Sequence, residues 1–122
     1  MNRELEMAKL ACRALDEKKG KDIKVIDIHE VSVIADYFVI ASASNQNQVQ
    51  AMVDNVDETL GRAGFEAKQI EGTRNSSWVL MDYGDMIIHI FDEENRLFYD
   101  LERIWRDGKI LDAQEFLAEG EE

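Results

Sequence analysis

The chain has 122 residues, 45% of them hydrophobic, and it contains no proline. This length suits one domain with a sizeable core, and the hydrophobic content excludes an intrinsically disordered chain. The 26 acidic residues outnumber the 14 basic residues, so the formal net charge is -12. Such a charge would repel a phosphate backbone, and we therefore expect a basic partner protein and little direct nucleic-acid contact.

The cysteine content and the hydropathy pattern bear on the cellular compartment. Cys12 is the only cysteine, so it can form no internal disulfide, and it lies on an apolar helical stripe that indicates a core position. No charged and apolar leader precedes it. No apolar run approaches the ~20 residues that a membrane span requires. These features predict a soluble cytoplasmic protein.

Periodicity predicts the elements of the first third of the chain. Residues 2–18 have the apolar spacing of a helix, with Gly20 as its C-cap candidate. A short strand is expected at 22–28, and a turn with a brief helical element at 29–36. Residues 37–44 are rich in aromatic and β-branched side chains, which favours a second strand.

A second helix follows, and Ser44 or Asn45 is expected to cap it. Gly64 is predicted to end it. Ser42 or Ser44 could instead bind an anion at the helix N-terminus, but the chain has no glycine-rich phosphate loop, so capping is the preferred interpretation. The apolar stripe of this helix consists of Val49, Met52, Val53, Val56, Leu60 and Ala63.

Three strands and a helix are predicted in the second half of the chain. A strand is expected at 65–70, a hairpin at 78–91 and a helix at 93–108. The acidic residues beyond Gly108 predict a frayed helix or a disordered tail. We therefore expect one α/β domain over residues 1–107, with a single mixed sheet of about five strands and two helices covering one face, and an acidic C-terminal tail over residues 108–122.

The predicted hairpin has two chemically different faces. A two-residue turn at Tyr83 and Gly84 would place Trp78 opposite His89. Burying Trp78 beside a histidine and acidic residues without partners would be costly, so we expect it to be exposed at a protein-binding surface. One face carries Val79, Met81, Met86, Ile88 and Ile90, and the mixed face carries Trp78, Leu80, Asp82, Asp85, Ile87, His89 and Phe91.

The same hairpin holds the candidates for an enzymatic site. Asp82, Asp85, Asp92 and His89 could bind a divalent metal. However, the first two flank a turn, where aspartate commonly bonds to the local backbone. The chain has no nucleophile elbow, and His29 is remote in sequence from Cys12. We therefore predict no metal, no cofactor and no catalytic residue.

Three segments of the sequence resemble the ribosomal silencing factor family, also called RsfS or Iojap. They are IADYFVIASAS at 34–44, WVLMDYGDMIIHIF at 78–91 and RLFYDLERIW at 96–105. The similarity runs from about Leu5 to Trp105, and the residues after Gly108 fall outside it. A glycine is common in the family where this chain has Ala43 or Ser44, and the 72–77 loop is more polar than the family pattern. Neither difference affects the hairpin.

The resemblance implies a nucleotidyltransferase-like α/β fold and a non-enzymatic function. Members of the family bind the large ribosomal subunit at large-subunit ribosomal protein fourteen and obstruct joining with the small subunit, which lowers translation when nutrients are scarce. Several associate as homodimers. The binding residues that the resemblance implies here are Trp78, Leu80, Asp82, Tyr83, Gly84, Asp85 and His89, with Arg96, Phe98 and Tyr99 close by.

An enzyme built on the same fold is the alternative hypothesis. A metal- or nucleotide-dependent transferase of this kind needs a Gly-Ser loop followed by paired metal-binding carboxylates on a neighbouring strand. No such pair follows the ASAS segment at 41–44. Phe98 and Trp105 could be either core or surface residues.

Overall fold

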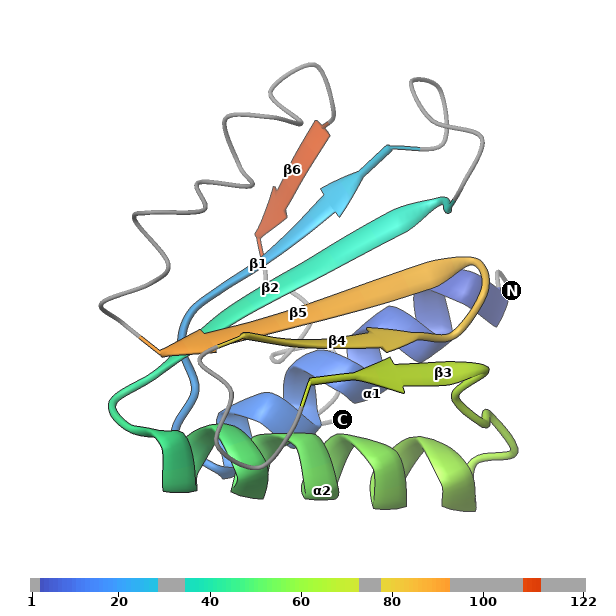
Figure 1. The fold of residues 1–122 in the computed structure, drawn as a ribbon. Coiled ribbons are helices and arrows are strands. Elements are labelled where there is room, and N and C mark those ends of the chain that lie inside the picture. The colour runs from blue at the N-terminus through green and yellow to red at the C-terminus, as the bar shows by residue number, and fades with distance from the viewer. Residues whose placement is uncertain (1–2, 29–34, 73–77, 93–108, 113–122) are drawn as a thin grey trace.

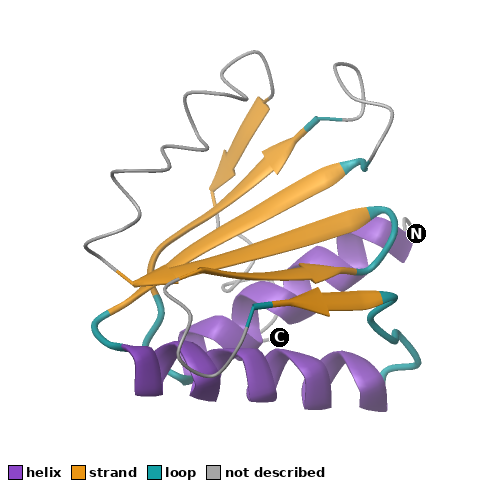
Figure 2. Cartoon of the chain, viewed as in Figure 1, coloured by secondary structure: helices purple, strands orange, loops and turns teal. Residues whose placement is uncertain are grey.

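The computed structural model describes residues 3–28, 35–72, 78–92 and 109–112. Within these residues the chain forms two helices and six strands, with loops between them (Figures 1 and 2). The elements are α1 (Arg3–Glu17), β1 (Lys21–Asp27), β2 (Tyr37–Ala43), α2 (Gln46–Arg62), β3 (Gln69–Glu71), β4 (Trp78–Asp82), β5 (Met86–Asp92) and β6 (Lys109–Asp112).

The strands form one mixed sheet in the order β3-β4-β5-β2-β1-β6. β2 and β5 are parallel, with Val39 opposite Ile88, and the other neighbouring pairs are antiparallel. Both helices lie on the same face of the sheet, as Figure 1 shows. The predicted α/β class, the mixed sheet and the two helices on one face are confirmed.

The sheet extends past the predicted domain boundary at residue 107. Lys109–Asp112 forms β6, which pairs antiparallel with β1 and places Ile110 opposite Ile26. The prediction of a frayed helix or a disordered tail is therefore wrong for these four residues. After pairing with β2, β1 has one edge left, and β6 supplies hydrogen-bond partners for the backbone groups along that edge.

Local signals set both ends of α2. At its start, the Asn45 Oδ1 atom accepts a hydrogen bond from the Gln48 backbone N–H at 2.8 Å, so Asn45 is the N-cap. At its end, Gly64 adopts a φ of 92°, and the Phe65 N–H donates to the Leu60 carbonyl at 2.8 Å. This is the Schellman arrangement, in which a left-handed glycine ends the helix, and it confirms the predicted end at Gly64.

The start of the third strand is later than predicted. β3 begins at Gln69 because Phe65 closes the preceding helix through its backbone and buries its ring in the core. Two other predicted elements are not tested. Most of the brief helical element at 29–36, and all of the helix at 93–108, lie outside the described residues.

Polar side chains on α2 join the two helices. The Gln48 Nε2 atom donates to the carbonyl oxygens of Lys18 and Lys19, both at 3.0 Å, where the chain leaves α1. Further along α2, the Asn55 Nδ2 atom donates to the Ala14 carbonyl at 2.8 Å. Because these bonds satisfy carbonyls at the C-terminal end of α1, they keep the helices side by side on the sheet.

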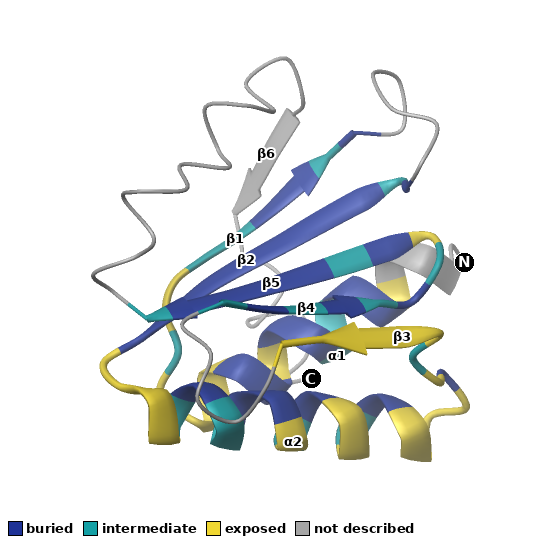
Figure 3. Cartoon of the chain, viewed as in Figure 1, coloured by how far each residue is buried: buried dark blue, intermediate teal, exposed yellow. Residues whose placement is uncertain are grey.

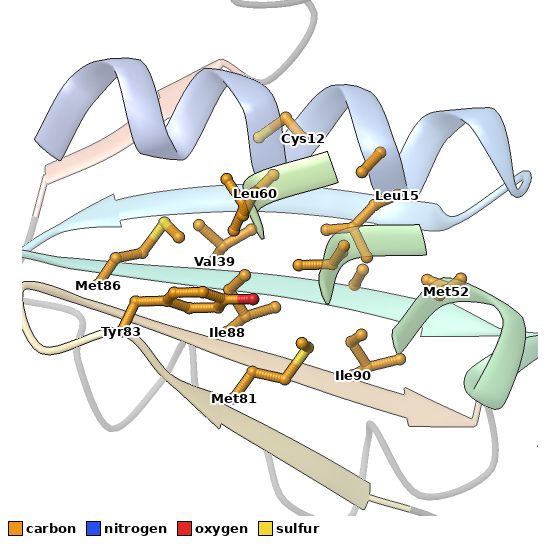
Figure 4. Close-up of a cluster of buried hydrophobic side chains, with 14 of the residues drawn as sticks. Cys12, Leu15, Val39, Met52, Leu60, Met81, Tyr83, Met86, Ile88 and Ile90 are labelled. Carbon is orange, nitrogen blue, oxygen red and sulfur yellow. The ribbon is translucent and has the colours of Figure 1, made fainter. Parts of the chain in front are cut away.

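The main core lies between the helices and the sheet (Figure 4). Cys12 has no exposed surface there, and burial raises the pKa of its thiol to about 12. The prediction that Cys12 is a core residue is confirmed. The largest fully buried members of the main core are Leu15, Val25, Met52, Leu60, Met81, Met86, Ile88 and Ile90.

The hairpin turn lies one residue later than predicted. The Tyr83 N–H donates to the Met86 carbonyl at 2.9 Å, so Gly84 and Asp85 form the turn. Gly84 adopts a φ of 88°, and the Asp85 N–H donates to the Tyr83 carbonyl at 3.2 Å, as in a classic γ-turn. Tyr83 precedes the two central turn residues because its side chain is buried in the main core.

The later turn changes the cross-strand partners but not the faces. Trp78 lies opposite Phe91 and Leu80 lies opposite His89, so the predicted pair of Trp78 with His89 is wrong. Moving the turn by one residue shifts each partner by two positions, and a shift of two returns every side chain to its original face. The aliphatic face points into the main core as predicted.

A candidate partner-binding face

The face of the sheet opposite α1 and α2, called here the second face, carries a smaller apolar cluster. Trp78 and Ile87 are partly buried and pack against it. Figure 3 shows that the central strands are largely buried, whereas β3 at the edge is exposed. The buried members of the cluster are Ile26, Ile28, Ala35, Phe38, Ile40 and Phe91.

Trp78 is anchored on the second face. Its Nε1–H donates to the Nδ1 atom of His89 at 3.1 Å, and its ring stacks on Phe91 with the centroids 5.4 Å apart. The sequence predicted an exposed Trp78, but the side chain is only partly exposed. The reason is that a diagonal neighbour supplies the hydrogen-bond partner that the indole needs when it is partly buried.

His89 is buried beneath Trp78 and is only 4% exposed. Its ring contacts Phe38 edge-on with the centroids 4.9 Å apart. Burial lowers the pKa of the imidazole from 6.5 to about 4, so the ring is neutral at pH 7. His89 lies on the mixed face, as the sequence predicted, but the aromatic side chains around it bury its ring.

Asp82 has the local backbone role that its position near a turn predicted. Its Oδ1 atom accepts a hydrogen bond from the Gly84 N–H at 2.8 Å. The carboxylate of Asp85 is exposed, while its backbone carbonyl accepts from the N–H groups of Asp36 at 2.8 Å and Tyr37 at 3.1 Å. The turn therefore presents one exposed acidic side chain and fixes the start of β2.

Tyr83 lies apart from the other predicted site residues. Its side chain is 7% exposed and belongs to the main core, where Figure 4 shows it among Met81, Met86 and Ile88. Burial, and secondarily the negative charge of Asp57, raise the pKa of its hydroxyl group. Trp78, Leu80, Asp82 and His89 do share the second face, whereas Arg96, Phe98 and Tyr99 lie outside the described residues.

A shallow hollow of about 110 Å³ lies where β3 and β4 meet. Trp78 and Leu80 line it, together with Glu71 and Gly72, which the sequence did not suggest as site residues. Glu71 lies opposite Leu80 in the register of these two strands. A prediction of the register between β3 and β4 would have placed Glu71 beside Leu80.

Within the described ranges, no three His, Cys, Asp or Glu side chains gather closely enough to hold a metal ion. Of the helices described, none combines the length and the apolar character needed to cross a membrane. The described part of the second face therefore offers apolar and aromatic surface with acidic residues at its border, and such surfaces suit protein binding.

The mixed sheet with both helices on one face defines a class of small α/β proteins. Structures of similar proteins have been solved. The chain superposes on a crystal structure of a protein from Chromobacterium violaceum with a TM-score of 0.81, at 34% sequence identity and covering 86% of this chain and 87% of that one. The model of the family described as "Ribosomal silencing factor during starvation" matches residues 1–122.

Curated proteins give the same result. The ribosomal silencing factor RsfS of Bacillus subtilis is 36% identical over 104 residues, which cover 85% of this chain and 88% of that protein. A mouse protein named "Mitochondrial assembly of ribosomal large subunit protein 1" is 31% identical over 94 residues, 75% of this chain and 41% of that protein. The chain belongs to the ribosomal silencing factor (RsfS) family, whose role is regulatory, in ribosome silencing. The predicted family is confirmed, and the match extends beyond the predicted limit at Trp105.

Proposed function

We propose that this protein lowers translation under nutrient limitation by binding the large ribosomal subunit and obstructing its joining with the small subunit. Membership of the ribosomal silencing factor family over the whole chain supports this proposal. The name of the mouse relative, which refers to the large ribosomal subunit, supports the choice of subunit. The protein acts in the cytoplasm as a steric regulator and not as an enzyme.

The proposed partner on the large subunit is large-subunit ribosomal protein fourteen. The net charge of -12 favours a basic protein patch over the phosphate-rich surface of ribosomal RNA. A partner patch with basic side chains around an apolar centre would complement the border and the centre of the second face. Arg96, Phe98 and Tyr99 remain predicted members of the binding surface.

The observation that carries this proposal is the exposure of apolar side chains beside acidic ones on the second face. Trp78 and Leu80 are both partly exposed there, and Glu71 borders the hollow that they line. Tryptophan is among the residues that most often contribute a large share of the binding energy at a protein interface. Gly84 and the exposed Asp85 extend the proposed surface to the hairpin turn.

Cosedimentation with separated ribosomal subunits tests the choice of partner. The protein should travel with the large subunit and not with the small one, and a large subunit without ribosomal protein fourteen should lose it. Travel with the small subunit, or binding that does not depend on ribosomal protein fourteen, would contradict the proposal.

A subunit-joining experiment tests the mechanism. When the protein is added before the subunits are mixed, the amount of joined ribosome in a gradient should fall. Ribosomes that have already joined and are translating should resist the protein, because the docking surface is covered. Equal action on both would refute steric obstruction.

Two further parts of the proposal concern the free protein. We expect a homodimer before ribosome binding, which the molar mass from light scattering would reveal as twice 14.0 kDa. The alternative, a transferase on the same fold, requires a divalent metal or a nucleotide. Tight binding of Mg²⁺, Mn²⁺ or a nucleoside triphosphate by the isolated protein would favour the enzyme.

A further inference from the structure

The hydrogen bond between Trp78 and His89 joins a partly exposed side chain to a buried one. The indole nitrogen of Trp78 can only donate, so the Nδ1 atom of His89, 3.1 Å away, must be the acceptor. The neutral imidazole therefore carries its proton on Nε2. The contact thus assigns one tautomer to the ring and one direction to the bond.

Packing alone does not account for a histidine at this position. The ring lies edge-on to Phe38 and parallel to Phe91, with centroid distances of 4.9 Å and 6.2 Å. A phenylalanine would fill this aromatic cluster without any polar atom. The histidine instead leaves its Nε2 atom buried with no hydrogen-bond partner among the described residues, and such an atom reduces folding stability. The useful polar atom of the ring is therefore Nδ1.

The indole of Trp78, which donates to the Nδ1 atom of His89, belongs to the proposed binding surface. Trp78 lines the hollow beside Leu80, and its indole is partly exposed. Loss of this hydrogen bond would remove one of the contacts that hold the partly exposed indole and would give its side-chain torsion angles more freedom. Such freedom has to be given up when a partner binds, which lowers the affinity.

We propose that His89 is a positioning residue, whose Nδ1 atom fixes the orientation of the Trp78 indole while the buried imidazole makes no contact with the partner. This inference rests on the proposed function, because it assumes that Trp78 meets the ribosomal partner. It also changes the expectation from the sequence, which placed His89 in the binding surface itself. The contact surface is formed by Trp78 and Leu80, and His89 acts from below.

Two substitutions separate the hydrogen bond from the packing. His89→Phe keeps an aromatic ring in the cluster and removes the acceptor. His89→Asn loses the ring but offers Oδ1 as an acceptor, and this atom is bonded to Cγ just as Nδ1 is in histidine. If His89 has a purely structural role, the Phe variant should be both more stable and the tighter binder. If His89 positions Trp78, the Asn variant should bind more tightly than the Phe variant.

The state of the hydrogen bond can be read directly from the indole Nε1–H signal of Trp78 in ¹H–¹⁵N NMR spectra. Trp105→Phe assigns the signal, since the chain has only two tryptophans. We expect slow exchange of this proton with water in the wild-type protein and in His89→Asn, and fast exchange in His89→Phe. Slow exchange in the Phe variant would refute the role of Nδ1.

Binding to the large ribosomal subunit is the second readout. Relative to wild type, His89→Phe should bind roughly fivefold more weakly, as the cost of immobilising one side chain on binding predicts, although it is the more stable variant. His89→Asn should bind more tightly than the Phe variant despite lower stability. Wild-type affinity of the Phe variant, or affinities that follow folding stability, would overturn the inference. If the wild-type protein does not bind the subunit, the proposed function fails, and the NMR comparison still decides whether Nδ1 fixes the indole.

Discussion

Met81 and Ile88 lie directly opposite each other in the antiparallel pair β4 and β5, and neither side chain has any exposed surface. Their neighbours on the same face, Val79 and Ile90, form the next pair pointing into the main core. Alternation along both strands places Trp78 and Leu80 on the other side of the same ribbon. One hairpin therefore supplies both part of the main core and the centre of the proposed binding surface.

Met81→Ala should lower stability without removing ribosome binding. The substitution leaves a cavity in the main core and should cost about 2 to 5 kcal/mol of the free energy of unfolding. Urea denaturation followed by circular dichroism measures this loss. Subunit binding, assayed at a temperature where the variant is folded, should stay close to that of the wild type. Unchanged stability would show that Met81 is not in the core.

Trp78→Ala should weaken binding to the large ribosomal subunit by roughly 2 kcal/mol or more, as truncation of a central interface aromatic does. Because the indole also stacks on Phe91, binding has to be compared between samples shown to be folded. Ile70→Ala is the matched control, since Ile70 is 41% exposed and pairs with Met81 on the opposite face. Equal affinity of Trp78→Ala and the wild type would place the docking surface elsewhere.

His89 should make stability depend on pH in a defined window. Burial lowers the pKa of its imidazole from 6.5 to about 4, so the unfolded chain binds a proton more readily than the folded one. The stabilising effect is complete above pH 6.5 and is lost as the pH falls toward 4, by roughly 3 kcal/mol over the window. The difference in unfolding free energy between wild type and His89→Phe isolates this effect. A difference that does not vary with pH would contradict it.

Gly84→Ala should destabilise the hairpin by about 1 to 2 kcal/mol, because the residue adopts a φ of 88°. An added Cβ would also lie 3.0 Å from the Lys68 Nζ atom, a flexible group that can move. Gly61→Ala in α2 is the control, since an added Cβ meets nothing within 4 Å there and alanine favours a helix by roughly 0.5 to 1 kcal/mol. Thermal unfolding should therefore shift in opposite directions for the two variants.

Association with the large ribosomal subunit should slow as salt is added. The protein carries a net charge of -12, and the Debye length falls from roughly 10 Å at 0.1 M salt to about 3 Å at 1 M. The equilibrium affinity should fall less than the association rate if apolar contacts around Trp78 hold the complex. Stopped-flow measurements over this range test the prediction, and a constant association rate would exclude electrostatic steering.

Features that depend on local pattern could be predicted from the amino-acid sequence. Helical spacing identified α1 and α2, and the residues at the ends of α2, Asn45 and Gly64, were recognisable because capping is a local backbone requirement. Strict alternation assigned Val79 and Met81 to the core face of the hairpin, and this assignment survived the wrong turn because an error of two positions preserves the face. The segments at 34–44, 78–91 and 96–105 were enough to indicate the family.

Features that depend on contacts between distant residues could not be predicted from the sequence and followed only from the fold. Burial of the Tyr83 ring in the main core moved the turn to Gly84 and Asp85, and aromatic neighbours from other strands buried His89 beneath Trp78. The strand at Lys109–Asp112 forms against the edge of β1, which no spacing within a four-residue segment can indicate. Hydrophobic periodicity and helix capping depend on residues that are close in the sequence. Burial of a side chain and pairing of an edge strand depend on contacts between residues that are far apart in the sequence.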